Sequence, residues 1–141
     1  MPQIDVNYLA VLVAAVANFA VGMLWYAKPL FGKAWTKLMG YDPMTPEKMA
    51  EMKKAMLPAM ISGLIAAVVS AYVLTHVIGY TGATSAIEGL QAGFWMWLGF
   101  IATVQLTGAL YGRKPLKLFY IDTGYQLAAM LVMGAILAVW R

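Results

Sequence analysis

Four long stretches of apolar residues constrain this chain more than any other feature of its sequence. Each reaches the roughly 20 residues that an α-helix needs to cross the hydrocarbon core of a bilayer. The four stretches are about Val6–Tyr26, Leu57–Ile78, Ala86–Leu110 and Leu116–Val139. Charged residues make up only 11% of the 141 residues, whereas a soluble domain carries about 25%. The sequence therefore predicts one integral membrane domain over residues 1–141, an all-α bundle of four transmembrane helices, and excludes a water-soluble enzyme.

The basic residues predict how these helices are oriented. Six lysines lie in the connection Ala27–Met56, and Arg113, Lys114 and Lys117 lie between the third and fourth spans or just beyond. The N-terminal tail and the turn Gly79–Ser85 hold no lysine or arginine. By the positive-inside rule, the basic connections are cytoplasmic and both termini lie outside. We expect these basic side chains to contact anionic lipid headgroups, not nucleic acid.

The longer basic connection carries two helix signals. The apolar residues of Phe31–Met39 follow helical spacing, which predicts a short amphipathic helix in the headgroup layer, ended by Gly40. Thr45-Pro46-Glu47 is typical of a helix N-terminus: a cap residue, a proline and an acid in the first turn. Pro58 frees the carbonyl of Lys54, so we expect a kink where this second helix enters the membrane.

The ends of the first and third spans resemble each other. Gly22–Leu30 aligns without gaps on Gly108–Leu116, with the shared pattern G-x-L-aromatic-x-x-K-P-L. This predicts a possible two-fold internal repeat of helix pairs with one orientation. Convergence is the alternative, because aromatic, basic and proline residues are generally favoured where a helix leaves the membrane.

Small residues predict where the helices pack, because membrane helices approach closely through them. The candidate seams, one helix after another, are Ala14, Asn18 and Gly22; Ser62, Ala66 and Ser70; and Gly89 with Gly93, followed by Gly99, Thr103 and Thr107. Several helices have more than one such face, so we expect a homo-oligomer. The methionines Met49, Met52, Met56 and Met60 share a face, for which ordinary packing is favoured over a ligand surface.

Asp122 is the polar residue of greatest interest. It lies about two turns into the fourth span, where a carboxylate is costly unless it is paired or protonated. Tyr125 and Gln126 share its helix face and would form a polar patch in the cytoplasmic half of the bundle. A structural pair with a nearby lysine or arginine is the simpler interpretation, and a proton-linked or ligand-binding role is the alternative.

Three further polar residues are weaker candidates. Ser85-Ala86-Ile87-Glu88 is a capping box, which accounts for Glu88 as the partner of the cap amide. The alternative is an outward-facing vestibule that Glu88 forms with Gln91 and Trp95. Asn18, near the middle of the first span, is expected to hydrogen-bond to another helix.

Catalysis finds little support in this sequence. The chain has no cysteine and one histidine, so thiolate, zinc and bis-histidine haem sites within one protomer are not expected. Asp122 and Glu88 are expected near opposite membrane faces, where they could not flank one bond. We therefore expect no enzyme, no metal and no cofactor.

Several short motifs together carry a resemblance to a known family. They are Leu24-Trp25-Tyr26, Pro29–Lys33 with Trp35, Trp97–Phe100, Gly124-Tyr125, Met133–Ile136 and Trp140. The chain resembles the domain-of-unknown-function family numbered 1761, small bacterial integral membrane proteins with four predicted spans. The resemblance implies a bacterial inner-membrane location and carries no activity, substrate or catalytic residue.

Two functions remain open at this stage. The first is a small oligomeric transporter or channel, with Asp122, Tyr125, Gln126 and Asn18 along a polar route. The second is a non-catalytic accessory or scaffolding subunit that docks a larger membrane complex through Phe31–Met39 and its small-residue faces.

Overall fold

The computed structural model describes residues 1–141 and is all-helical. The helices are α1 (Tyr8–Trp25), α2 (Lys33–Leu38), α3 (Pro46–Thr81), α4 (Ala86–Met96), α5 (Thr103–Tyr111) and α6 (Leu116–Val139). Two short segments join them: η1 (Lys28–Gly32), which is kinked at the non-helical residue Leu30, and the π-helical η2 (Trp97–Ala102). Because η2 continues α4 directly into α5, Ala86–Tyr111 is a single span, and four helices are long and apolar enough to cross a membrane. The predicted four-helix membrane fold is confirmed.

The second long helix begins earlier than its apolar stretch. It starts at Pro46, as the signal Thr45-Pro46-Glu47 predicts, because Thr45 caps it by accepting a hydrogen bond from the Lys48 amide. The helix then continues through Pro58 without a break. The predicted N-terminal signal and the expected entry helix are thus parts of one 36-residue helix. The short helix predicted within Phe31–Met39 is also present, as α2, and Gly40 follows it with a φ of 79°.

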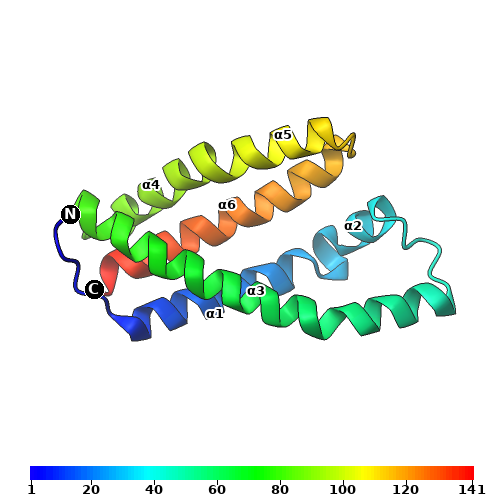
Figure 1. Ribbon diagram of the computed structural model, residues 1–141, viewed down its shortest axis with the longest axis horizontal. Coiled ribbons are helices and arrows are strands. Elements are labelled where there is room, and N and C mark those ends of the chain that lie inside the picture. The colour runs from blue at the N-terminus through cyan, green and yellow to red at the C-terminus, as the bar shows by residue number, and fades with distance from the viewer.

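Both chain termini lie at one end of the bundle, beside the turn between α3 and α4 (Figure 1). We call this the terminal end. The opposite end, which we call the basic end, carries α2, the loop before α3 and the turn between α5 and α6 (Figure 1). Nine of the ten lysines and arginines belong to these segments or to the helix turns beside them, and Arg141 alone lies at the terminal end.

Helix α6 is the centre of the bundle, because it packs against α1, α3 and α4. It supplies nine of the 24 buried residues. The hydrophobic core lies in the half nearer the terminal end, where alanines of α1 meet larger side chains of α3 and α6. Its most deeply buried members include Ala14, Ala71, Leu74, Ile78 and Met133.

Glycine brings α4 and α6 into backbone contact near the terminal end. A Cβ atom added at Gly89 would collide with the carbonyl oxygen of Gly134, and one added at Gly93 would collide with that of Met130. Only glycine permits this approach, so the predicted Gly89–Gly93 seam is confirmed as a helix-packing surface.

The seam predicted on the second span does not form within the protomer. Ser62, Ala66 and Ser70 are exposed, and the buried face of α3 runs through Ala67 and Ala71. This neighbouring face continues to larger apolar residues that fill the space beside the alanines of α1. Packing of large side chains against small ones therefore decides which face is buried, not small residues alone.

The seam predicted at Gly99, Thr103 and Thr107 does not form within the protomer either, since all three residues are exposed. The threonine hydroxyls donate to carbonyls of their own helix. The cause is the wide turn of η2, which changes the face that the following residues present. Gln105 and Ala109 turn toward α6 in their place.

The two repeated motifs begin with the same local structure. The Tyr26 amide donates to the carbonyl of Gly22 at 3.0 Å, and the Gly112 amide donates to that of Gly108 at 2.9 Å. The copies then diverge, because the next residue is extended in the first copy, with a ψ of 151° at Ala27, and left-handed in the second, with a φ of 50° at Arg113. The likeness holds for two helix ends, and duplication of whole helix pairs stays a prediction.

Candidate functional site

A cavity of about 740 Å³ opens at the basic end between α1, α2, α3 and α6. We call it the basic-end cavity. Its walls combine apolar side chains with a small polar group contributed by α2 and α6. The lining residues are Phe19, Gly22, Met23, Tyr26, Trp35, Thr36, Met52, Met56, Ala59, Met60, Gly63, Asp122, Tyr125 and Gln126. This size and composition are typical of small-molecule sites.

Asp122 is the only charged residue in the wall of this cavity. It is the seventh residue of α6 and is half-buried. The Tyr26 hydroxyl donates to its Oδ1 atom at 2.6 Å. Asp122 is therefore paired as expected, but its partner is a tyrosine hydroxyl, and no lysine or arginine forms an ion pair with it.

Asn18 connects the cavity wall to the core. The Tyr125 hydroxyl donates to Asn18 Oδ1, and Asn18 Nδ2 donates to the sulfur of Met133 at 3.5 Å. The hydrogen bond to another helix predicted for Asn18 is confirmed. Gly22 makes room for this arrangement, because a Cβ atom there would lie 3.2 Å from the Tyr125 ring.

Two tryptophans fix the position of α6 beside Asp122. The indole N–H of Trp25 donates to the carbonyl of Ile121, and that of Trp97 donates to the carbonyl of Thr123, each at 2.9 Å. The Thr123 hydroxyl in turn donates to Gln105 of α5. The stretch of α6 that carries Asp122 is thus held by polar contacts from both sides.

Asp122 also lines a second, smaller cavity of about 280 Å³ between α5 and α6. Its other lining residues include Gln105, Lys114 and Phe119. Since one carboxylate borders both cavities, Asp122 separates an apolar cavity without basic residues from a smaller one that contains a lysine.

The methionine face of α3 lines the basic-end cavity, whereas the sequence pattern favoured ordinary packing. Met52, Met56 and Met60 line the basic-end cavity, and Met56 and Met60 are exposed. They form its wall opposite α6. This placement agrees with a ligand surface, which was the less favoured interpretation of the sequence pattern.

The remaining predicted site residues lie far from Asp122. Glu88 and Gln91 are at the terminal end, where they line a hollow of about 230 Å³ with Trp95. Glu88 forms the predicted capping box, because its Oε2 accepts from the amides of Thr84 and Ser85 at 2.8 and 3.0 Å. The chain therefore has two polar regions, one at each end, and the predicted face of Glu88, Gln91 and Trp95 is present.

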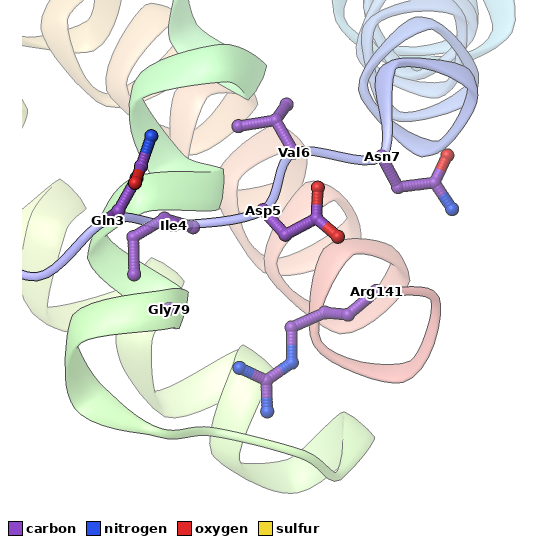
Figure 2. A pocket seen from close by; sticks show the side chains of 7 residues that line it. All are labelled: Gln3, Ile4, Asp5, Val6, Asn7, Gly79 and Arg141. Atoms are coloured by element: carbon purple, nitrogen blue, oxygen red, sulfur yellow. The ribbon is translucent and has the colours of Figure 1, made fainter.

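A further hollow of about 560 Å³ lies among the chain ends (Figure 2). The N-terminal tail crosses the end of α3 there, with Ile4 packed against Gly79. The side chains of Asp5 and Arg141 border the same space without forming an ion pair (Figure 2). Because every other lining residue comes from the tail or from Gly79, this hollow is a product of how the chain ends are placed.

Sequence reasoning did not identify three polar residues of the site as such. The sequence pattern places Trp35 only in the headgroup-layer helix, and it assigns no role to Tyr26 or Gln105. Tyr26 lies 96 residues from Asp122, so no helical periodicity links the two. The available signal is topological, because Tyr26 and Asp122 both lie near helix ends that the basic connections place on one side of the membrane.

One family model matches the chain, over residues 9–138. Its description is "Protein of unknown function (DUF1761)". No curated protein and no solved structure matches the chain. The match includes most of all four spans and assigns no activity, so the function has to be argued from the site.

Proposed function

The chain belongs to the DUF1761 family, whose function is unknown, and we propose that it is a small oligomeric transporter whose solute binds at Asp122. One observation carries this proposal: a half-buried carboxylate in a membrane bundle faces a cavity large enough for a small molecule. Charged residues inside membrane proteins are costly and commonly mark substrate or ion pathways.

The closure of the bundle beyond this cavity supports transport over a permanently open channel. Toward the terminal end, the path from the cavity meets the Tyr125–Asn18–Met133 contact and then the packed core around Ala14 and Leu137. A binding site that is reached from one end and closed toward the other fits one state of an alternating-access cycle. We therefore infer that the helices move during transport.

Binding and transport fit this site better than catalysis does. The basic-end cavity holds a single carboxylate, and Glu88 lies at the other end of the bundle. Two acidic groups cannot then act on one bond, as acid–base chemistry by a carboxylate pair requires. We propose that the protein is not an enzyme.

Uptake into proteoliposomes tests the transport proposal. Three radiolabelled probes, tetraphenylphosphonium, glycine and benzoate, represent a cation, a zwitterion and an anion. We expect the protein to take up one class faster than protein-free liposomes do, and Asp122→Asn to abolish this uptake. Asp5→Asn is the matched control, since it removes a carboxylate outside the cavity. No uptake of any probe, or equal uptake by the Asp122→Asn protein, would overturn the proposal.

The exposed small-residue faces support a homo-oligomer. Ser62, Ala66 and Ser70 on α3 lie outside the protomer core, as do Gly99 and Thr103 on the third span. We propose that a second copy covers at least one of these faces. Native mass analysis in mild detergent tests this, and a single monomeric species would contradict it.

We also propose an inner-membrane location with both termini outside, supported by the nine basic residues at one end. Because the chain has no cysteine, single substitutions give an unambiguous test in intact cells. A membrane-impermeant maleimide should label Thr84→Cys from outside and should leave Met44→Cys unlabelled. The reverse labelling pattern would show that the proposed orientation is inverted.

An accessory subunit is the second candidate, and one observation favours it. The first half of α3 is almost wholly exposed, and its outer face carries Leu57, Ile61 and Ile65 without a covering helix. Trp35 is unsuitable for testing a docking surface, because its ring packs against Tyr26 and Tyr41 within the chain. The double variant Leu57→Ala, Ile61→Ala should release a stoichiometric partner, and retention of that partner would exclude this surface.

A further inference from the structure

The basic-end cavity has a charge opposite to that of its surroundings. Nine basic residues lie at this end of the molecule, yet none of the 14 lining residues is a lysine or arginine. Lys114 borders only the smaller cavity on the other side of Asp122. The one formal charge that a molecule in the basic-end cavity meets is the carboxylate of Asp122.

This carboxylate has capacity for a further partner. Tyr26 occupies Oδ1, and no group of the chain donates a hydrogen bond to Oδ2. A charged group in a largely apolar site is stabilised by pairing with an opposite charge. Because no basic side chain pairs with Asp122, a bound cation would supply the missing positive charge.

Three aromatic residues line the same cavity as Asp122. The Tyr26 ring meets the Trp35 ring edge-on with centroids 5.8 Å apart, and the Tyr125 ring with centroids 5.5 Å apart. All three residues line the cavity. Aromatic rings attract cations, most strongly where water is excluded. The rings therefore favour the same sign of charge that Asp122 does.

The rest of the cavity wall is apolar, so it would contact apolar groups carried by that cation. Met23 of α1 and three methionines of α3 line the cavity, and Phe19 and Ala59 add apolar surface. Methionine side chains are flexible and polarizable, so they adapt to bodies of different shape. A bare metal ion would leave this surface unused and would find one carboxylate where hard cations take six or more oxygen ligands.

We propose that the basic-end cavity binds an amphipathic organic cation, an ammonium or phosphonium centre carrying apolar groups. Asp122 pairs with its charge, Tyr26, Tyr125 and Trp35 surround that charge, and the methionines hold its apolar groups. This proposal names the substrate class of the transporter proposed above and rests on it for its role in transport, although binding is measurable without transport.

An anionic amphiphile, such as a fatty acid or an acidic lipid, is the alternative occupant. The lysines of the basic end would favour its charge, but its apolar chain would then lie beside the unpaired carboxylate oxygen. The two occupants therefore predict opposite preferences for charge at equal shape.

Tetraphenylphosphonium and tetraphenylborate provide this comparison, because they have nearly the same shape and opposite charge. Binding to the purified full chain in dodecyl maltoside is followed by calorimetry and by quenching of tryptophan fluorescence. We expect the cation to bind at least about tenfold more tightly than the anion, which corresponds to about 1.4 kcal/mol. Equal or tighter binding of the anion would overturn the proposal in favour of an anionic amphiphile.

Two variants locate the binding. Asp122→Asn should weaken binding of tetraphenylphosphonium at least about tenfold, and Asp122→Glu should restore part of the affinity because it keeps the charge. Met56→Trp places bulk in the cavity from an exposed position of α3 and should block binding without disturbing the core. Unchanged binding in both Asp122→Asn and Met56→Trp would exclude the cavity as the site.

This experiment also separates the two proposals. Specific binding of the cation without uptake in liposomes would leave the substrate class standing and overturn transport. Uptake of glycine or benzoate that depends on Asp122, without binding of the cation, would leave transport standing and overturn the substrate class.

Discussion

At the terminal end of the bundle, α4 and α6 touch backbone to backbone where Gly89 meets Gly134. At the basic end, the same α6 borders a cavity of about 740 Å³, with α1, α2 and α3 on its other sides. In Figure 1 the long helices converge toward the chain termini and separate toward α2. One central helix therefore takes part in a closely packed half and in an open half.

The side chains explain this difference. Near the terminal end, glycines and alanines let the helices approach until larger residues fill the space between them. Near the basic end, aromatic residues such as Trp25 and Tyr26 take their place and hold α6 through single hydrogen bonds. Apolar packing has no hydrophobic driving force in lipid, so close contact stabilises the first half and polar contacts position the second. The closed half is suited to stability, and the open half to binding.

The largest expected effect comes from breaking the closed half. Gly89→Ala adds a Cβ atom that collides with the carbonyl oxygen of Gly134, so α4 and α6 must separate along their shared seam. We expect the free energy of unfolding to fall by about 3 kcal/mol, as for an overpacked core. Unfolding in mixed detergent micelles, followed by circular dichroism, measures it.

Gly108→Ala is the matched control on the same span, outside the faces proposed for contact with a second copy. A Cβ atom at Gly108 has no neighbour within 4 Å, so this variant should unfold like the unmodified protein. Equal destabilisation by both variants would show that alanine disturbs the helix itself, and the contrast between the two halves would lose its basis.

The sequence predicts the closed half better than the open half. Span positions follow from hydropathy, because lipid imposes the same length and apolarity on every crossing helix. The Gly89–Gly93 seam follows as well, since only glycine allows backbone contact. The early start of α3 was also readable at Thr45, but Pro46–Met56 is too polar to join the apolar stretch.

The faces that helices present are harder to predict. Gly99, Thr103 and Thr107 keep an ideal spacing of four residues, but the π-helical turn of η2 moves them away from α6. Nothing in the local sequence required that turn. A single π-helical turn adds about one residue, which rotates the faces of the remaining helix by roughly 100°.

The candidate site was predicted in part for the same reason. Asp122, Tyr125 and Gln126 share one helix face, so periodicity brings them together. The contact between Asp122 and Tyr26 depends instead on the rotation and axial offset of α1 against α6. Hydropathy fixes neither quantity, so the partner of Asp122 could be placed at the correct end of the bundle but not identified.

The boundary between the two halves gives the next prediction. The Tyr125 hydroxyl donates to Asn18, which lies at the edge of the core. Asn18→Ala and Tyr125→Phe each remove one side of this bond, and the double variant should cost less than the sum of the two. We expect a coupling energy of about 1 kcal/mol, as for hydrogen bonds between membrane helices. A strictly additive double variant would show that the contact does not join the halves.

The smallest expected effect lies inside the open half. Tyr26→Phe keeps the ring but removes the hydroxyl that donates to Asp122. We expect a loss of only about 0.6 kcal/mol in the free energy of unfolding, because the Asp122 carboxylate borders the cavity and can be solvated there. Tyr111→Phe is the matched control, since Tyr111 is 88% exposed.

If Tyr26→Phe destabilised the protein as much as Gly89→Ala does, the Tyr26–Asp122 pair would support the fold in the way that the glycine seam does. A small loss of stability together with altered affinity for tetraphenylphosphonium would instead assign the pair to binding, because the hydroxyl then acts on the carboxylate that the ligand meets and not on the packing of the helices.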